Sequence, residues 1–197
     1  MHALIAQSHF HLIVLYAAMV LCYVPEWIGS VFQRPEKGAI KRDRGSHVFL
    51  IAAIVAGVFL GFWCANAVPA ATLTWQQPVQ FWIGIALMLA GLAFRWHAIR
   101  VLGEFFTRDV ATRPGQCVVE TGPYRWIRHP SYTGSLLMLL GTGLAMTNWV
   151  SLLAVACGAL IGHAYRVHVE EQALCADLGD AYREYMQRTR RFIPFVW

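Results

Sequence analysis

The sequence has little charge, and one long stretch has none. Of its 197 residues only 14% are Asp, Glu, Lys or Arg, whereas 57% are hydrophobic, and the mean hydropathy is +0.47. Residues 129–165 contain no residue of these four charged types. This composition lies outside the usual range of soluble globular domains and is typical of an integral membrane protein.

Motifs that define several large enzyme classes are also missing. The chain has no HExxH zinc motif, no Walker loop, no GxSxG nucleophile motif and no dinucleotide-binding glycine fingerprint. Its five cysteines lack the spacing of a metal site or a disulfide framework. Although the net charge is +5, acidic residues are interspersed among the basic ones, and the sequence contains no basic helix or RNA-binding motif. We therefore expect contacts with membrane lipids and none with nucleic acid.

Four apolar regions predict the membrane-spanning helices. Three can each cover a hydrocarbon core that needs about 20 helical residues: Ala3–Val24, Ser46–Val68, and Val79–Ala93 extending toward Leu102. The fourth, residues 129–165, is too long for one span, and Thr147 and Asn148 interrupt its middle. We therefore predict a helical hairpin there, whose first helix starts at Pro130 because proline is tolerated at the first helical position. The whole chain is predicted to be an all-α, polytopic membrane protein with about five transmembrane helices.

The distribution of positive residues predicts the orientation in the membrane. All 16 Lys and Arg residues fall after the first, third and fifth predicted spans, or in the loop between the third and the fourth. The connection "PAATLTWQQP" and the "TN" turn contain none. Because Lys and Arg in short loops are retained in the cytoplasm, we expect the N-terminus outside and the C-terminus and the site in the cytoplasm.

Polar residues gather in the C-terminal half. We expect residues 1–102 to form three transmembrane helices with a basic cytoplasmic loop, and residues 103–197 to form the cofactor-binding and catalytic half. After the fifth span, apolar positions recur at three- and four-residue steps, namely Leu174, Leu178, Tyr182 and Tyr185. This pattern predicts a C-terminal helix lying along the membrane interface, with a bend at Gly179.

Three polar clusters are candidates for chemistry: the loop "GQCVVETGPY", the stretch "RHPSY" before the fourth span, and "RVHVEE" at the end of the fifth. In the last cluster His163, Arg166 and Glu170 share one helical face, while Glu171 points about a quarter-turn away. Ionisable groups at the edge of a membrane must face protein or water, which favours a functional role.

Simpler interpretations of these residues remain open. Arg166 and Glu170 are also compatible with an exposed ion pair, worth only a few tenths of a kcal/mol. Arg125, Trp126 and Arg128 are typical of interfacial anchors.

The ordered set "TGPYRWIRHPSYTG", a helical hairpin, "RVHVEE" and "LGDAYREYMQRTRRFIP" resembles the isoprenylcysteine carboxyl methyltransferase family and its phospholipid methyltransferase relatives. The resemblance covers the C-terminal half and implies an S-adenosylmethionine pocket without a Rossmann domain. It implies catalytic roles for Glu170 and Arg166, with Arg166 on the substrate carboxylate. It implies cofactor contacts at Gln116, Cys117, Val118, Val119, Tyr124, His129, Pro130, Ser131, Tyr132 and Glu170. At Gln116 the sequence departs from the family, where histidine is frequent.

The chemistry of methyl transfer agrees with these residue types. A carboxylate such as Glu170 suits a cationic sulfonium, and donors such as His129 and Tyr132 suit its amino-acid tail. Transfer requires alignment and exclusion of water, and a carboxylate acceptor needs a positioning cation such as Arg166 but no general base. We therefore expect a methyltransferase that acts on a lipophilic small molecule or lipidated substrate, most simply the carboxyl group of an isoprenylcysteine.

Other functions remain alternatives at this point. A phospholipid or another small lipophilic N- or S-acceptor would suit the same architecture. The "RHPSY" stretch also occurs in NADPH-dependent isoprenoid and sterol reductases. A non-enzymatic membrane scaffold would use the same polar clusters as anchors.

Overall fold

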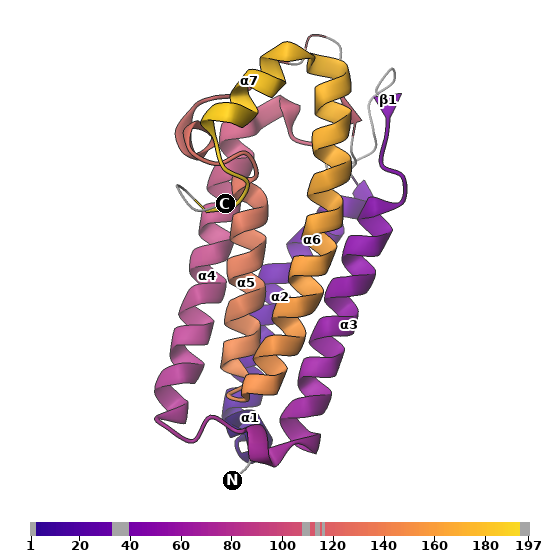
Figure 1. The fold of residues 1–197 in the computed structure, drawn as a ribbon. Coiled ribbons are helices and arrows are strands. Elements are labelled where there is room, and N and C mark those ends of the chain that lie inside the picture. Colours follow the sequence, from indigo (N-terminus) through magenta and orange to yellow (C-terminus); the bar gives the residue numbers. More distant parts are fainter. Residues whose placement is uncertain (1–2, 33–39, 108–110, 113–114, 116, 194–197) are drawn as a thin grey trace.

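The computed structural model describes residues 3–32, 40–107, 111–112, 115 and 117–193, and in them the chain forms an elongated bundle of helices (Figure 1). Its long helices are α2 (His9–Phe32), α3 (Ser46–Ala67), α4 (Gln77–Leu102), α5 (Pro130–Ala145) and α6 (Trp149–Leu178). Its short elements are α1 (Leu4–Gln7), α7 (Asp180–Arg188), η1 (Pro69–Ala71), η2 (Gly103–Phe105) and η3 (Gly122–Arg125). Two short antiparallel strands, β1 (Ile40–Lys41) and β2 (Ala111–Thr112), join loops outside the bundle. The predicted all-α class is confirmed.

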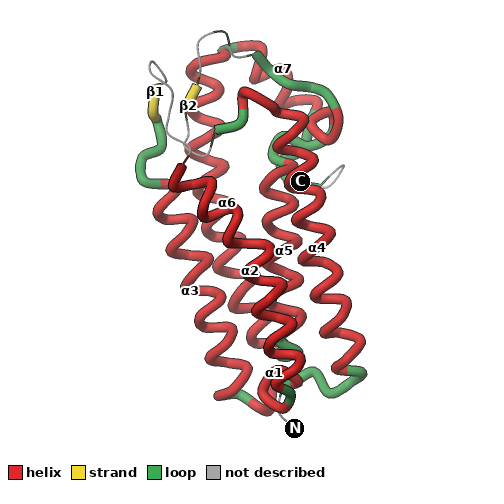
Figure 2. The backbone as a smooth tube through the Cα atoms, turned by 180° about the vertical axis from the view of Figure 1, so that it is seen from behind, coloured by secondary structure: helices red, strands yellow, loops and turns green. Residues whose placement is uncertain are grey.

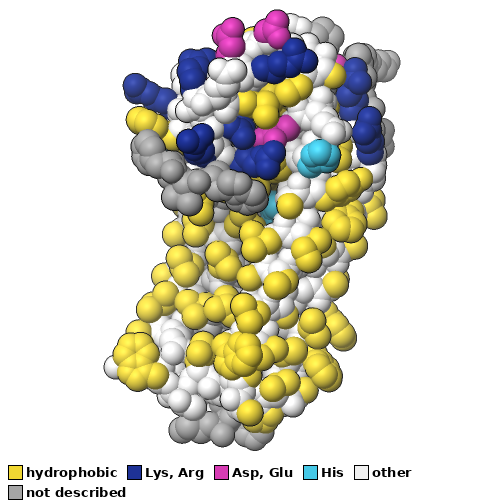
Figure 3. All heavy atoms as spheres, in the orientation of Figure 1, with side chains coloured by type: hydrophobic (Ala, Val, Ile, Leu, Met, Phe, Trp, Pro, Cys, Tyr) yellow, Lys and Arg dark blue, Asp and Glu magenta, His cyan; other side chains and the backbone are white. Residues whose placement is uncertain are grey.

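Four of the helices are long and apolar enough to cross a membrane: His9–Gly29, Ser46–Ala67, Gln77–Phe105 and Trp149–Leu178. Hydrophobic side chains cover the body of the molecule, while Lys and Arg gather at the end that carries α7 (Figure 3). The protein is therefore an integral membrane protein. The predicted hairpin also forms, because α5 ends at Ala145 and α6 begins at Trp149. With 16 residues α5 is shorter than an ordinary span, and it packs between α4 and α6.

The first span begins later than the sequence predicted. Ser8 has an extended backbone and separates α1 from α2. Its hydroxyl lies 2.7 Å from Nδ1 of His11 in the first turn of α2. Pro25 lies inside α2 without ending it, so the helix continues to Phe32 instead of stopping near Val24.

Small residues let two helix pairs approach until their backbones touch. A Cβ atom added to Gly141 on α5 would lie 2.5 Å from the carbonyl oxygen of Gly84 on α4. A Cβ atom added to Gly158 on α6 would lie 2.5 Å from the carbonyl oxygen of Ala53 on α3. Glycine at such positions is the usual device for close packing inside a membrane, where lipid removes most of the hydrophobic driving force. These close contacts fix the positions of α4, α5 and α6 in the bundle, and with them the positions of the polar residues at the ends of these helices.

The C-terminal helix differs in position from the prediction. Helix α6 is one 30-residue helix that continues to Leu178, past the start of α5 at the pocket end of the bundle. The residues up to Leu178 therefore do not form a separate interfacial helix. The bend is at the predicted place, because Gly179 has a φ of 60° in the left-handed region. After it, α7 turns back across the end of the bundle (Figures 1 and 2).

The opposite end of the bundle is closed by the turn between α5 and α6. The backbone N–H of Leu4 donates to the hydroxyl of Thr147 at 2.8 Å, and the N–H of Leu73 donates to the Thr147 carbonyl at 3.0 Å. The Asn148 side chain accepts from the N–H of Ser151 at 3.1 Å and donates to the carbonyl of Val68 at 3.0 Å. Asn148 thereby caps α6 and joins the turn to the α3–α4 connection.

Candidate functional site

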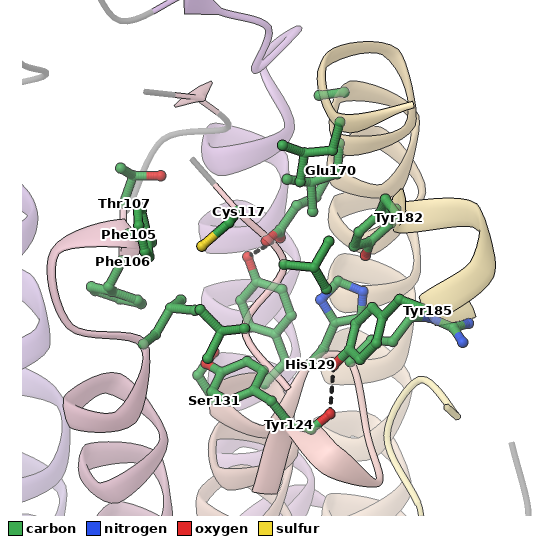
Figure 4. A pocket seen from close by; sticks show the side chains of 18 residues that line it. Phe105, Phe106, Thr107, Cys117, Tyr124, His129, Ser131, Glu170, Tyr182 and Tyr185 are labelled. Atoms are coloured by element: carbon green, nitrogen blue, oxygen red, sulfur yellow. Dashed lines mark hydrogen bonds between the residues drawn. The ribbon is translucent and has the colours of Figure 1, made fainter. Parts of the chain in front are cut away.

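A pocket lies at the end of the bundle that carries α7 (Figure 4). Its walls come from the loop after α4, from η3 and the start of α5, and from the last turns of α6 together with α7. Pro130 begins α5, as predicted, because proline at the first helical position leaves no needed N–H unpaired. The aromatic residues around the pocket include Phe105, Phe106, Tyr182 and Tyr185. Among its described lining residues Glu170 is the only carboxylate.

A chain of hydrogen bonds holds Glu170 in place. The Tyr132 hydroxyl donates to Oε2 of Glu170 at 2.7 Å and accepts from Nε of Arg166 at 3.2 Å. Nη1 of Arg166 donates to the Asp43 carboxylate and, at 2.8 Å, to the Ser46 hydroxyl. We call Glu170, Tyr132, Arg166 and Asp43 the relay. It connects the pocket to the loop before α3, and only 2% of Arg166 is exposed.

The far end of the relay is anionic. Burial alone would raise the pKa of Asp43, but the charge of Arg166 and hydrogen bonds from Ser46 and the backbone N–H of His47 outweigh it. The pKa of this carboxyl therefore lies below its ordinary value. Arg166 keeps a permanent counter-ion, which balances its charge inside the protein.

Two histidine rings pack against the ring of Tyr132 in the relay. The His129 ring stacks on Tyr132 with centroids 5.6 Å apart, and Tyr132 meets the His163 ring edge-on at 5.4 Å. Nδ1 of His163 lies 2.8 Å from the carbonyl of Ala159, so it carries the proton. Nε2 then accepts from the Ser135 hydroxyl at 3.1 Å. The Tyr132 ring is thus held between two histidine rings, which orients its hydroxyl toward Glu170.

Glu171 belongs to a different set of contacts, which we call the clamp: Glu171, Arg128, His129 and Arg191. Glu171 accepts from Nε of Arg128 at 2.9 Å, from Nη2 of Arg191 at 2.8 Å and from Nε2 of His129 at 3.3 Å. Arg128 also donates to the carbonyls of Met186 and Thr189 at 3.0 and 2.6 Å. The clamp attaches the segment after α7 to the stretch before α5.

Backbone contacts extend this attachment. The N–H of Arg128 donates to the carbonyl of Arg190 at 2.7 Å, and the N–H of His129 donates to the carbonyl of Arg191 at 3.1 Å. The Tyr185 hydroxyl donates to the carbonyl of Tyr124 at 2.6 Å.

Burial, with the nearby charge of Glu170, raises the pKa of Tyr124. Tyr124 therefore stays a neutral hydrogen-bonding group at the pocket.

The pocket brings together most of the residues that the resemblance assigned to the cofactor. Its lining contains Cys117, Val118, Val119, Tyr124, His129, Ser131, Tyr132 and Glu170. Pro130 lies beside them at the start of α5 but is not part of the lining. Gln116 lies outside the described residues. Arg166 lies behind Tyr132 and contributes no atom to the lining.

The structure corrects one interpretation and adds Asp43 and Arg191 to the residues around the site. Arg128 is no interfacial anchor, because its side chain is only 8% exposed and is paired with Glu171. In contrast Trp126 is 50% exposed, with the Arg125 guanidinium 5.4 Å from its ring, as expected at an interface. Asp43 and Arg191 were missed, as was the pairing of Glu171 with Arg128 and His129, because these residues are far apart in sequence. The acidic residue in "KRDRGS" was the only available signal for Asp43.

These features define a polytopic helical membrane protein with a pocket at one end of its bundle. Residues 82–176 match the model of the isoprenylcysteine carboxyl methyltransferase (ICMT) family. The chain is therefore similar to this family over these residues. The matched segment contains the start of α5, the hairpin and both glutamates of α6.

Individual relatives agree with the family match. The chain is 34% identical over 121 residues to protein-S-isoprenylcysteine O-methyltransferase B of Arabidopsis thaliana, covering 59% of this chain and 61% of the relative. It is 32% identical over 116 residues to protein-S-isoprenylcysteine O-methyltransferase of Saccharomyces cerevisiae, covering 58% and 48%. The chain spans 61%, 41% and 48% of the matched relatives from Arabidopsis thaliana, Tribolium castaneum and Schizosaccharomyces pombe.

The fold also has a solved counterpart. The chain is similar to the structure of a eukaryotic intramembrane Ras methyltransferase, ICMT, with a TM-score of 0.58 and 23% sequence identity. The superposition covers 95% of this chain and 63% of the other. The likeness therefore includes the N-terminal helices, which the family match over residues 82–176 leaves out, and it concerns the fold alone.

Proposed function

We propose that this protein is a membrane methyltransferase that uses S-adenosylmethionine and binds it in the pocket between the loop after α4, the start of α5, and α6 with α7. One observation carries this proposal. Residues from three separate stretches, which the resemblance assigned to the cofactor, line one pocket with a single described carboxylate, Glu170. A pocket with one carboxylate, aromatic rings and small loop residues suits a ligand that is cationic at one end and aromatic at the other.

The residues of the pocket fit this ligand in separate ways. We propose that Glu170 binds the positively charged part, because Tyr132 engages only one of its oxygens in the described contacts. Phe105, Phe106 and Tyr182 offer faces for an adenine ring. The donor supplies an electrophilic methyl group on a sulfonium, so the protein needs to align it, exclude water and balance charge.

Arg166 acts in this proposal as a positioning residue. Its Nε bond fixes the Tyr132 hydroxyl, which in turn fixes Glu170. The resemblance also implied that Arg166 binds the acceptor carboxylate. Because its guanidinium already bonds Asp43, Ser46 and Tyr132, an acceptor at Arg166 would have to replace one of them.

We propose an acceptor that is a lipophilic molecule with a carboxyl group, such as an isoprenylated cysteine. The names of the curated relatives support this choice. The site also supports it, since a carboxylate is already ionised, whereas an amine acceptor would need a base and would be repelled by nearby arginines. The pocket end carries the Lys and Arg residues seen in Figure 3, so we place it in the cytoplasm and the N-terminus outside.

The test of the proposed function is cofactor binding. Purified full-length protein in lipid nanodiscs should bind S-adenosylhomocysteine and show no thermal shift with NADPH. Glu170→Gln should weaken binding by about 2 kcal/mol, roughly 30-fold, because one charged contact is lost. Glu184→Gln, an exposed site on α7, is the matched control and should change nothing. Equal affinity in Glu170→Gln and the control would remove Glu170 from the site.

A second measurement addresses Arg166. Arg166→Ala should reduce methyl transfer strongly, while the affinity for S-adenosylhomocysteine falls only by the loss of Tyr132 positioning, about 1 kcal/mol. If Arg166→Ala abolished cofactor binding completely, Arg166 would belong to the cofactor site itself.

A further inference from the structure

Three arginines at the pocket end of the bundle differ from the others. The side chains of Arg100, Arg125 and Arg190 are exposed and form no hydrogen bond or ion pair with the residues that the structure describes. Every other arginine with a described side chain bonds a carboxylate or an amide. The donors of these three guanidinium groups are therefore available to a partner outside the chain.

Two of these arginines lie over tryptophan rings. The Arg100 guanidinium lies 5.9 Å from the centroid of the Trp96 ring on α4, and the Arg125 guanidinium lies 5.4 Å from that of Trp126. Both rings are on the surface, with Trp96 43% and Trp126 50% exposed. A guanidinium held over a ring by cation–π attraction can still donate its N–H groups to an anion.

The two pairs belong to adjacent elements. Helix α4 ends at Leu102, and η3 packs against its last turn, where a Cβ atom added to Gly122 would lie 3.2 Å from the Val101 side chain. The third arginine joins them through the backbone, since the N–H of Arg190 donates to the carbonyl of Trp126 at 3.1 Å. We call the five residues of this surface the basic patch: Trp96, Arg100, Arg125, Trp126 and Arg190.

The order of residues along α4 matches the layers of a lipid leaflet. The exposed residues deeper in the bundle are hydrophobic and include Trp82, Ile83 and Leu89. Trp96 follows, and Arg100 lies roughly 6 Å nearer the pocket end at 1.5 Å per residue. Apolar side chains thus give way to an aromatic ring and then to a cation, as hydrocarbon gives way to head groups. The basic patch therefore lies at the depth of the phospholipid phosphates.

We propose that the basic patch binds the phosphate of an anionic phospholipid of the surrounding leaflet, and that the bound lipid supports the wall of the cofactor pocket formed by η3. Charge complementarity selects the occupant. Three guanidinium groups without a carboxylate partner among the described residues favour a lipid with net negative charge over a zwitterionic lipid, whose ammonium group they repel. The fork of an arginine also matches the geometry of a phosphate.

The basic patch and the cofactor pocket share η3. Tyr124, directly before Arg125, is 5% exposed and lines the pocket, and its carbonyl accepts from the Tyr185 hydroxyl. A lipid that holds Arg125 and Trp126 at the membrane surface restricts this four-residue helix. The cofactor then has less ordering to impose when it binds. Lipid binding is independent of the proposed methyltransferase function, whereas the effect on the pocket rests on it.

The first test compares two lipids that share the phosphate and the acyl chains. Native mass spectrometry of full-length protein in detergent micelles should show dioleoyl phosphatidylglycerol bound about tenfold more tightly than dioleoyl phosphatidylcholine. Arg100→Gln combined with Arg125→Gln should abolish this preference. The matched control combines Arg183→Gln with Arg188→Gln on α7, which removes the same charge from two exposed, ion-paired arginines and should keep the preference.

Three results would overturn the lipid site. One is equal binding of the two lipids by wild type. Another is an equal loss of preference in the two double variants, because only the total charge of this end would then attract the lipid. The third is displacement of the lipid by soluble glycerol phosphate at equal concentration, which would make the ligand a free phosphate.

A single tryptophan variant tests the aromatic part of the basic patch. Trp126→Ala should weaken phosphatidylglycerol several-fold, because the lipid loses the ring that faces its glycerol region. Trp75→Ala is the matched control, since Trp75 is 72% exposed before α4, at the other end of the bundle, and it should leave the affinity unchanged. Equal effects of the two variants would contradict a site at Trp126.

The second test measures the effect on the pocket. The affinity for S-adenosylhomocysteine should be several-fold higher in nanodiscs that contain phosphatidylglycerol than in nanodiscs of phosphatidylcholine alone. This ligand has no net charge near neutral pH, so the surface potential of the bilayer does not concentrate it. Arg100→Gln combined with Arg125→Gln should remove the difference between the two bilayers.

The outcomes distinguish the two proposals. If wild type binds S-adenosylhomocysteine equally well in both bilayers, the link between lipid and pocket is overturned and the proposed function stands. If phosphatidylglycerol binds through the basic patch but S-adenosylhomocysteine binds in neither bilayer, the lipid site stands and the methyltransferase assignment falls.

Discussion

Two adjacent glutamates on α6 have contrasting surroundings. Glu170 is half-buried, lines the pocket and accepts a single described hydrogen bond, from the neutral hydroxyl of Tyr132. Glu171 is 5% exposed and accepts from two arginines and a histidine. Consecutive helical residues point about 100° apart, so one faces the pocket and the other the segment after α7. A carboxylate surrounded by protein cations is structural, and one left with a neutral donor can still bind a cation.

The largest expected effect is a loss of stability when the clamp loses the charge of Glu171. Glu171→Gln leaves Arg128 without its counter-charge in a buried position, which should lower the free energy of unfolding by about 3–5 kcal/mol. Thermal unfolding in nanodiscs, compared with Glu170→Gln, measures it. We expect a large loss of stability for Glu171→Gln and a small one for Glu170→Gln. Similar melting temperatures for the two variants would show that the glutamates do not differ in role.

The next effect concerns the far end of the relay. Asp43→Asn should lower stability at pH 7 by about 2 kcal/mol, because Arg166 loses a charged partner. The folded-state pKa of Asp43 lies below its unfolded value, so its contribution is present above about pH 4 and is lost as the pH falls through the folded pKa. The difference in melting temperature between wild type and Asp43→Asn should therefore close in acid. A difference that persists at low pH would mean that the carboxylate charge is irrelevant.

A smaller effect, on cofactor affinity, is expected when the relay loses the Tyr132 hydroxyl. Tyr132→Phe keeps the ring between His129 and His163 but removes the hydroxyl that orients Glu170. We expect the affinity for S-adenosylhomocysteine to fall by about 1 kcal/mol, and the free energy of unfolding to fall by about as much because the buried Nε of Arg166 loses its acceptor. Calorimetric titration gives the value, with the conservative Tyr182→Phe as a comparison. An unaltered affinity would show that Glu170 needs no support.

The smallest effect belongs to an exposed ion pair near the same end. Arg188 on α7 lies 3.1 Å from Glu120, with side chains 60% and 43% exposed. Glu120→Gln should change the unfolding free energy by only a few tenths of a kcal/mol, because water screens such pairs. A loss close to that of Glu171→Gln would indicate that burial does not separate the two kinds of pair.

Local patterns in the sequence predicted the elements that depend on local physics. The hairpin followed from an uncharged stretch longer than one span, and the bend followed from Gly179. The start of α5 followed from Pro130. These features need only the membrane thickness and the backbone preferences of single residues.

The contacts that distinguish the two glutamates could not be read in the same way. Glu171 meets Arg128, which is 43 residues away, and Arg191, which is 20 residues away. Arg166 meets Asp43 across 123 residues. Helical periodicity placed Glu171 on another face than Glu170, but it gave no information on which distant cations would face it. Residue type alone therefore predicted Arg128 as an anchor, whereas the tertiary fold buries it.

The turn at Thr147 and Asn148 has a consequence for how the chain is assembled during synthesis. The N–H of Leu4 in the first helical segment donates to Thr147, and in the α3–α4 connection the Val68 carbonyl accepts from Asn148 and the Leu73 N–H donates to Thr147. These partners emerge from the ribosome long after the early helices have entered the bilayer. The helices that are inserted early therefore lack their hydrogen bonds to this turn until the last hairpin has been inserted.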